Sequence, residues 1–421
     1  MKQDTSVLNV KDRTQCPMDL ENQFAVEWRE KICTETTDVC TRSFSKSLRA
    51  IVLTGSLARD EGTFVEDNGA TMLLGDVDFF LIFNRREALP KAATVQAAAN
   101  EIGMRLGQRG LLCKVGLEAV SPRFFRKLPA DIATYELRKC GNVIWGDQAA
   151  LSLIPACAPF QIRQEDAWQT LNNRLIEMVD NVRSLTPEAR ELAPALQYAT
   201  TKLYLDMATS YLVFAGGYAP SYRERAAHLL KISAEQPADA PFPLGKFARR
   251  VASCTAWKLS GAKRHCDSSI EFWKDAIRYA RKLWCWELAQ LTKSSERQTS
   301  EMLFRRLAAA QGVAPRFRGW LSIMKRCGGV RSWRRWPHWV RLSFRASPRY
   351  LIYYVSAEVT FCLPCLIWGE ATLPRLNPNY RCLENLLPEA NPAAGHGMPP
   401  WRKLADDVIW NYSRFLIGTR A

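Results

Sequence analysis

Two aspartates, Asp76 and Asp78, open an apolar run that continues to Phe83. Side chains at positions i and i+2 of a β-strand project from the same face, so the two carboxylates would stand side by side. Such a pair is costly unless a cation neutralises it, and carboxylate oxygens suit magnesium. The pattern therefore indicates a metal site at the start of a buried strand. An exposed acidic strand end is the alternative interpretation.

Two further features lie on neighbouring segments of the chain. Gly55 and Ser56 follow an apolar run, and a glycine there would let a phosphate approach the backbone closely. Arg59 follows one turn later and would reach the same phosphate. Glu118 lies near the end of the apolar run 111–120, where a carboxylate would complete a metal site or accept a proton from an attacking hydroxyl. A plain turn and a surface glutamate are the structural alternatives.

The elements that would position these residues follow from hydrophobic periodicity. Strands are expected at 48–54, 76–83 and 111–120, and helices at 20–46 and 87–108. The pair Asn68-Gly69 is typical of a type I′ turn and has apolar flanks, so a small hairpin is expected before the second strand. The fold class indicated is α+β, with a small mixed β-sheet and flanking helices.

Strand signals end after Asp147, and apolar residues at helical spacing predominate from there on. We therefore expect a mixed domain over 1–150 and a mainly α-helical domain over 151–312. A basic, tryptophan-rich helical region over 313–421 completes the chain.

The positive charge is concentrated in one segment. The chain has 58 Lys and Arg against 42 Asp and Glu, a formal net charge of +16. Residues 1–150 are balanced, with 20 basic and 20 acidic side chains, whereas residues 301–350 hold 12 basic and one acidic. This distribution argues against a nucleic-acid coat protein and indicates one local basic segment on a balanced protein.

Within that segment, residues 316–349 interleave arginines with four tryptophans, among them Trp333 and Trp336. Such a pattern would bind a polyanion by phosphate contact and base stacking, or lie on an anionic membrane surface. The structural interpretation is that Trp333, Trp336 and Val340 share helical spacing and form core, with the arginine stems covering them. All three interpretations stay open at this point.

Composition and short motifs exclude other classes. The 13 cysteines lack the spacing of a disulfide scaffold, and the first residues contain no apolar core of a secretory signal, so a cytoplasmic protein is expected. The apolar stretch 350–368 is long enough to cross a membrane, but Glu358 at its centre and Pro364 favour a core helix over a transmembrane segment. Neither a P-loop nor a zinc-protease motif is present.

The order of these motifs resembles the polymerase-β-type nucleotidyltransferase superfamily over roughly residues 45–150. The resemblance rests on a glycine–serine turn, then two aspartates on a strand, then an acidic residue on the next strand. A helix and short strand that follow are similar to those that close the minimal domain in bacterial members. The residues that carry it are 54–62, 75–83, 116–120 and 134–147.

The resemblance implies a magnesium-dependent nucleotidyltransferase. Ser56 and the adjacent backbone at Gly55 would hold the β- and γ-phosphates of a nucleoside triphosphate, with Arg59 beside them. Asp76 and Asp78 would bind two magnesium ions, and Glu118 the one that activates an acceptor hydroxyl. That oxygen would attack the α-phosphorus and expel pyrophosphate.

In this superfamily a helical domain often closes over the triphosphate, and Lys202 would supply a cation from it; a solvated helix lysine is the alternative. Two departures from the family pattern stand out: the gap between Ser56 and Asp76 is longer than usual, and the third acid is usually aspartate, not the glutamate at 118.

A non-catalytic nucleotide-binding or regulatory module is one alternative function. A peripheral nucleic-acid- or membrane-binding protein acting through 316–349 is the other.

Overall fold

The computed structural model divides into two compact units. The first comprises residues 1–128, 136–155 and 259–264, and the second comprises residues 129–135, 156–258 and 265–421. The residues that the structure describes are 17–67, 69–84, 88–183, 185–186, 188–235, 237–260, 267–295, 298–326, 333–368, 380–392 and 399–416.

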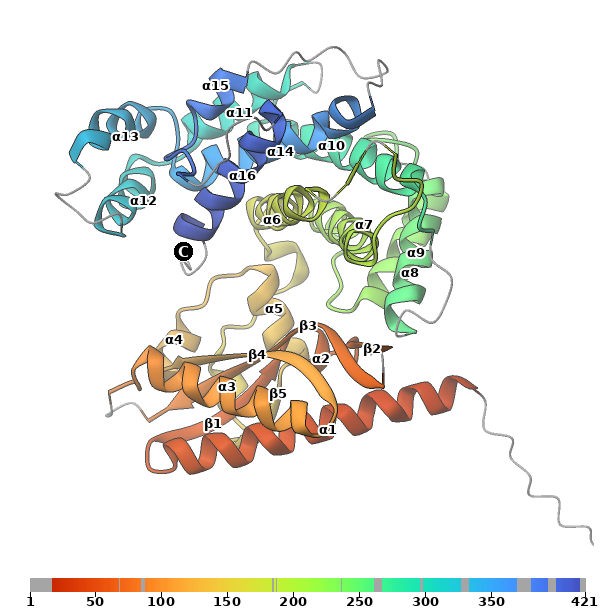
Figure 1. Ribbon diagram of the computed structural model, residues 1–421, viewed down its shortest axis with the longest axis vertical. Coiled ribbons are helices and arrows are strands. Elements are labelled where there is room, and N and C mark those ends of the chain that lie inside the picture. The colour runs from red at the N-terminus through yellow and green to blue at the C-terminus, as the bar shows by residue number, and fades with distance from the viewer. Residues whose placement is uncertain are drawn as a thin grey trace, which may run out of the picture. The chain divides into compact units, whose positions relative to one another are not determined.

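The first unit is a mixed sheet with helices packed on it (Figure 1). The strands are β1 (Leu48–Thr54), β2 (Thr63–Asp67), β3 (Ala70–Phe83), β4 (Leu111–Val120) and β5 (Asn142–Gly146). The helices are α1 (Pro17–Phe44), α2 (Gly55–Ala58), α3 (Ala92–Gln108), α4 (Pro122–Arg126) and α5 (Ile132–Cys140), the last divided between the two units. A 3₁₀ turn (Ala150–Leu153) follows β5.

β3 is the strand around which the sheet is built. Its first half pairs with β2 and its second half with β1, both antiparallel, while β4 runs parallel along its other edge. Phe64 lies opposite Leu73 and Val65 opposite Met72, so the predicted hairpin is confirmed; Asn68 lies outside the described residues. The predicted strand over 76–83 is thus the second half of one strand of 14 residues.

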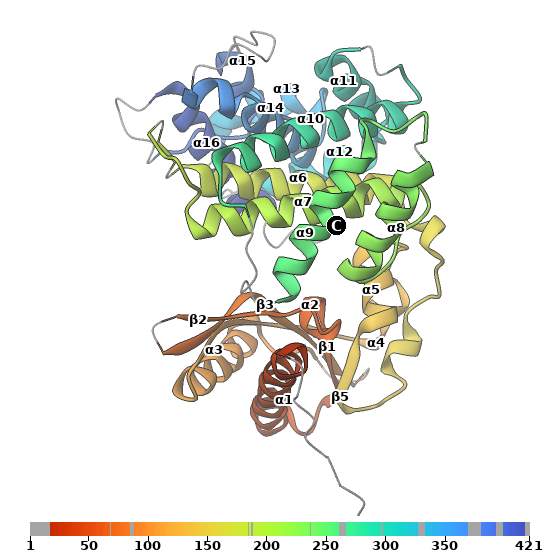
Figure 2. The ribbon, with the colours of Figure 1, turned by 90° about the vertical axis from the view of Figure 1, so that its right-hand side faces the viewer.

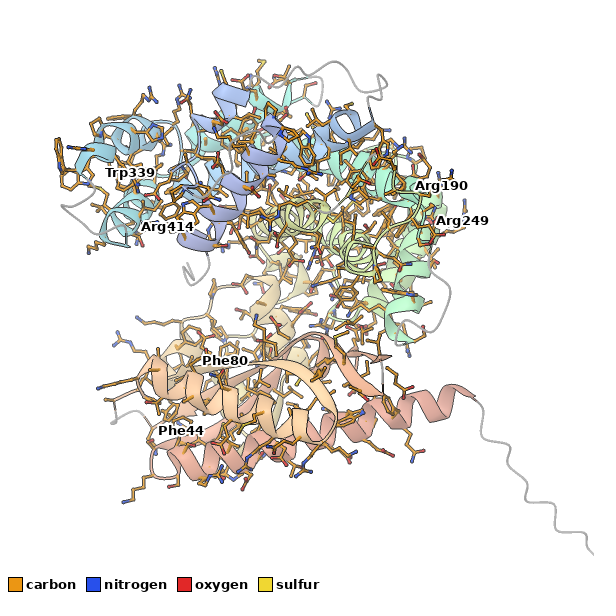
Figure 3. The ribbon with its side chains drawn as sticks, in the orientation of Figure 1. Phe44, Phe80, Arg190, Arg249, Trp339 and Arg414 are labelled. Atoms are coloured by element: carbon orange, nitrogen blue, oxygen red, sulfur yellow. The ribbon has the colours of Figure 1, made fainter. Side chains whose placement is uncertain are left out.

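Alternation along β3 gives the sheet two apolar faces. Val77, Phe79 and Leu81 pack with α1 and α3, which lie side by side against one face (Figure 2). On the other face Phe80 and Ile82 pack beneath α4 and α5, where Phe80 meets Phe125. Figure 3 labels Phe80, and also Phe44 of α1, which packs on the first face. Both faces of this half of β3 are therefore covered, as its run of consecutive apolar residues predicts.

The second unit is helical throughout the residues that the structure describes (Figure 1), apart from one isolated bridge. After a 3₁₀ turn (Pro159–Gln161), its helices are α6 (Gln164–Val182), α7 (Pro194–Phe214), α8 (Tyr222–Glu235), α9 (Leu244–Leu259), α10 (Ile270–Thr292), α11 (Ser300–Ala310), α12 (Val313–Arg326), α13 (Trp336–Ser343), α14 (Pro348–Trp368), α15 (Tyr380–Glu384) and α16 (Pro400–Asn411). A π-helical turn (Tyr412–Leu416) follows α16. The expected α+β class, a mixed sheet with flanking helices followed by a mainly helical region, is confirmed.

The expected division into three regions differs from the two units observed, and α14 supplies the physical reason. Its side chains are almost all buried, and it packs against α6, α10 and α16. The residues after 312 therefore share one apolar core with those before it. By length and composition α14 would suffice to cross a membrane, yet 83% of its most apolar window is buried inside the protein.

The tryptophans of the basic segment do not pack as their spacing suggests. Trp333 and Val340 are exposed, whereas Trp320 and Trp339 are buried and donate their indole N–H groups to backbone carbonyls. The interpretation of Trp333, Trp336 and Val340 as a core stripe is therefore wrong. The segment is helical as its spacing predicts, but the buried face of α13 contains Trp339 and not the neighbouring Val340.

One buried acid in the second unit gives a pH-dependent prediction. Glu287 of α10 is fully buried, accepts a hydrogen bond from Ser210 Oγ at 2.6 Å, and has a pKa that burial raises from 4.5 to about 8. Below pH 4.5 the group is protonated in both folded and unfolded chains. As the pH rises toward 8, only the unfolded chain releases its proton, so stability falls by up to about 1.4 kcal/mol per pH unit.

We expect Glu287→Gln to remove this penalty, because the amide stays neutral and its oxygen still accepts from Ser210. Thermal unfolding between pH 5 and 8 should show the variant gaining stability over wild type as pH rises. The exposed Glu188→Gln provides the matched control and should follow wild type throughout. Parallel curves for Glu287→Gln and wild type would contradict the raised pKa.

Candidate active site

The two aspartates lie on β3 where the sheet's second face becomes open. Asp76 and Asp78 share that face with Phe80 and Ile82, but α4 and α5 cover only the latter two, and both aspartates are exposed. The pattern of side chains along β3 follows from this cover. Where helices pack on both faces of the strand, the residues are apolar on both; where one face lacks a helix, that face carries the aspartates.

Asp78 is seated between two glycines. It pairs with Thr54 of β1 on one side and with Gly116 of β4 on the other. A Cβ atom added to Gly116 would lie 2.4 Å from Asp78 Oδ1, and one added to Gly55 would lie 3.8 Å from Oδ2. The carboxylate therefore occupies space that exists because Gly116 has no side chain, whereas a side chain at Gly55 would only reach ordinary van der Waals contact with it.

Gly55 also requires glycine for its backbone, since its φ of +74° lies in the left-handed region. It turns the chain out of β1 into α2, where Ser56 accepts backbone hydrogen bonds from Arg59 and Glu61 through its carbonyl. The turn that the sequence assigned to phosphate binding is thus held next to Asp78.

Glu118 lies on the same face of the sheet, two residue pairs farther along the strands than Asp78 and Gly116. It is opposite Phe80, is half-buried, and has one carboxylate oxygen enclosed by the protein. Across the described ranges, no three His, Cys, Asp or Glu side chains are grouped as a metal site, so Glu118 does not join the two aspartates in such a cluster. Its assignment as the third acid stays a prediction.

The donor set at Asp76 and Asp78 nevertheless fits magnesium. This ion is usually held by one or two carboxylates together with substrate phosphates and water, not by a complete cage of protein ligands. Two carboxylates on one exposed face, one of them seated over Gly116, match that requirement. Lys114 lies 3.5 Å from Asp76, but both side chains are exposed and such a pair contributes little energy.

Arg59 is placed differently from its predicted role. Its side chain is only 7% exposed and forms ion pairs of 2.9 Å with Glu61 and 2.6 Å with Glu136. A phosphate would have to compete with these two carboxylates for the guanidinium. The geometry favours a positioning role, in which Arg59 ties the turn after β1 to α5.

Lys202, the predicted phosphate ligand of the helical region, belongs to the second unit. It lies on α7 with its Nζ 3.9 Å from Glu177 and 5.5 Å from the ring centre of Tyr198. Lys258 of α9 is almost fully buried and lies 5.7 Å from the same ring. Two ammonium groups thus gather around Tyr198, whose pKa is raised by burial.

Sequence reasoning missed two of these features. Gly116 was included in the resemblance, but its importance lies in its pairing with Asp78, and nothing in a single strand shows that pairing. Lys258 lies at the end of a helix far from Lys202 in sequence, and no local pattern links them. The one sequence signal is its helical spacing with the apolar residues Val251 and Cys254, because a lysine on the apolar face of a helix needs a partner.

Comparison with known proteins does not assign the chain to a family. No protein-family model and no curated protein matches the chain. Among solved structures, it is similar to a spectinomycin adenyltransferase of Enterococcus faecialis, solved with ATP and spectinomycin. The match has 12% sequence identity and a TM-score of 0.37, and it covers 60% of this chain and 98% of that one. Similarity at this level does not identify a family.

Proposed function

We propose that the protein is a magnesium-dependent nucleotidyltransferase that moves a nucleoside monophosphate from a nucleoside triphosphate to a hydroxyl acceptor. The observation that carries the proposal is the pair Asp76 and Asp78, exposed on one face of β3 with Asp78 seated between Gly55 and Gly116. Crowded carboxylates without a cation are unfavourable, so a fold that holds two together at an open face favours a bound cation. Their order along the chain resembles that of the superfamily.

In the proposed reaction the acceptor oxygen bonds to the α-phosphorus, and the bond from that phosphorus to the bridging oxygen of pyrophosphate breaks. Asp76 and Asp78 would hold magnesium, which stabilises negative charge on the attacking and leaving oxygens when bound. The turn at Gly55 and Ser56 would hold the β- and γ-phosphates through backbone and hydroxyl groups. Glu118 would bind the second ion or accept the acceptor's proton.

By the resemblance to the superfamily, Lys202 would provide a cation to the triphosphate. Positioning of the two reactants supplies the remainder of the rate enhancement in such a site. Arg59 would act indirectly, by fixing the turn that carries Ser56.

Titration calorimetry with each of the four nucleoside triphosphates tests the proposal without knowledge of the acceptor. We expect at least one triphosphate to bind in magnesium and to lose most of its affinity in EDTA. Mass spectrometry of metabolite extracts incubated with that triphosphate should then reveal a product heavier by one nucleoside monophosphate. Binding without any transfer would favour a non-catalytic nucleotide-binding module, and no magnesium-dependent binding would refute the site.

A further inference from the structure

Helices α12 and α13 of the second unit, and the residues that flank α13, carry apolar side chains that no residue of the described ranges buries. On α12 these side chains lie at every fourth position, and the same spacing of four separates one on α13 from one at the residue that ends that helix. They are Val313, Phe317, Leu321, Trp333, Val340 and Phe344, and they are 42–71% exposed. Residues spaced by four lie on one side of a helix, so each helix presents an apolar stripe to solvent.

These stripes are distinct from the faces by which the two helices pack onto the unit. Trp320 and Ile323 of α12, and Trp339 and Leu342 of α13, are the buried residues. Leu321 follows the buried Trp320 by one residue and Val340 follows the buried Trp339 by one, so each is turned about 100° from its buried neighbour. The core of the unit is therefore complete without them.

The two helices contact each other, and side chains of α12 donate hydrogen bonds to the chain just after α13. Arg316 of α12 donates a hydrogen bond of 3.2 Å to the carbonyl of Phe344, and Trp320 donates one of 2.9 Å to the carbonyl of Ala346. Figure 1 shows α12 and α13 adjacent, and Trp339, which anchors α13, is labelled in Figure 3. We call this region, including the basic residues named next, the α12–α13 surface.

Basic side chains flank the apolar stripes. Arg318, Lys325, Arg334, Arg341 and Arg345 are exposed, and none forms an ion pair with a carboxylate in the described part of the chain. Arg335 is not counted among them, because it forms an ion pair with the buried Glu389 and so stabilises the fold. The α12–α13 surface thus combines uncovered apolar side chains with uncompensated positive charge.

We propose that the α12–α13 surface docks the protein on an anionic lipid bilayer, with the apolar stripes inserted among the acyl chains and the basic side chains at the headgroups. Amphipathic helices with Trp, Phe and Leu beside Arg and Lys bind membrane interfaces in this way. The proposed docking is peripheral: among the described residues, the one helix long and apolar enough to cross a membrane is α14, and 83% of its most apolar window is buried inside the protein.

The exposed side chains favour a lipid bilayer over two other partners, a nucleic acid and a second copy of the chain. Half of the six apolar side chains, Val313, Leu321 and Val340, are aliphatic and have no ring on which a nucleic-acid base would stack. The aromatic half would suit either partner, whereas hydrocarbon accepts all six. A second copy of the chain would bring the same uncompensated positive charges together across a two-fold interface, which is unfavourable. An anionic lipid surface satisfies both the apolar and the charged side chains.

Flotation with vesicles tests the proposal on the full-length protein. We expect binding to vesicles of phosphatidylglycerol and phosphatidylcholine, and little to phosphatidylcholine alone. The double variant Phe317→Ser, Phe344→Ser should bind at least tenfold more weakly even at low salt. The pair Arg318→Gln, Arg345→Gln should lose about fivefold for each arginine, and the loss should diminish at high salt.

Phe160→Ser is the matched control, because Phe160 is 77% exposed elsewhere on the same unit, and it should bind as wild type. Thermal unfolding of each variant establishes that the fold persists, as expected for exposed positions. Equal binding to neutral and anionic vesicles, or no loss in the Phe317/Phe344 variant, overturns the proposal. So does binding of an oligonucleotide in place of vesicles, or a dimer that the same two substitutions abolish.

Discussion

Replacing Asp76 or Asp78 with asparagine is expected to lower nucleotidyl transfer by about a thousandfold or more. Each change removes one of two carboxylates that would hold magnesium, and charge stabilisation by such an ion supplies several kcal/mol of the barrier reduction. The fold should persist, because both side chains are exposed and loss of one charge relieves repulsion between them. Melting temperatures equal to or slightly above wild type are therefore expected.

Product formation measured with radiolabelled triphosphate, alongside thermal unfolding, checks this result. Glu66→Gln is the matched control, since Glu66 is an exposed carboxylate on the neighbouring strand β2 and should retain full activity. Wild-type transfer by the double variant Asp76→Asn, Asp78→Asn would remove the assigned site.

Gly116→Ala is expected to reduce transfer by about a hundredfold although it adds a single methyl group. The new Cβ would lie 2.4 Å from Asp78 Oδ1, a distance that no real contact permits, so the carboxylate must turn away from its seat. A displacement of about 1 Å at a reacting centre costs this much rate. Stability should change little, because the atom that must move is at the end of an exposed side chain.

Gly107→Ala provides the control for this prediction. Gly107 lies in α3, where an added Cβ meets no atom within 4 Å, so activity should be unchanged and stability slightly higher. Wild-type kinetics for Gly116→Ala would mean that the observed position of Asp78 is not the one used in the reaction.

The elements of the first unit were largely predictable from the sequence. The strands over 48–54 and 111–120 have the predicted bounds, because apolar runs bounded by Gly or Ser-Pro are strong local signals. The helix expected over 87–108 begins instead at Ala92, since Pro90 disfavours helical backbone in the residue before it. The mainly helical character expected after Asp147 is likewise observed in the described part of the second unit.

Which tryptophans of the basic segment are buried could not be predicted from local sequence. Several of them share helical spacing with one another, so periodicity alone allows more than one stripe to be the buried one. Trp320 and Trp339 are buried because backbone carbonyls at Ala346 and Pro388 lie where their indoles can donate hydrogen bonds. Those carbonyls come from segments distant in sequence, so only packing selects the face.

By itself, the sequence determined that Asp76 and Asp78 share one face of a strand, that a glycine turn precedes them, and that positive charge is local to one segment. These properties depend on neighbours within a few residues, which a single chain records directly. Only the tertiary structure decided that Asp78 sits over Gly116, that Glu118 lies two residue pairs farther on, and that Arg59 is ion-paired. Those relations depend on the register between strands and on contacts between segments up to 77 residues apart, which are set by hydrogen bonding and packing across the fold.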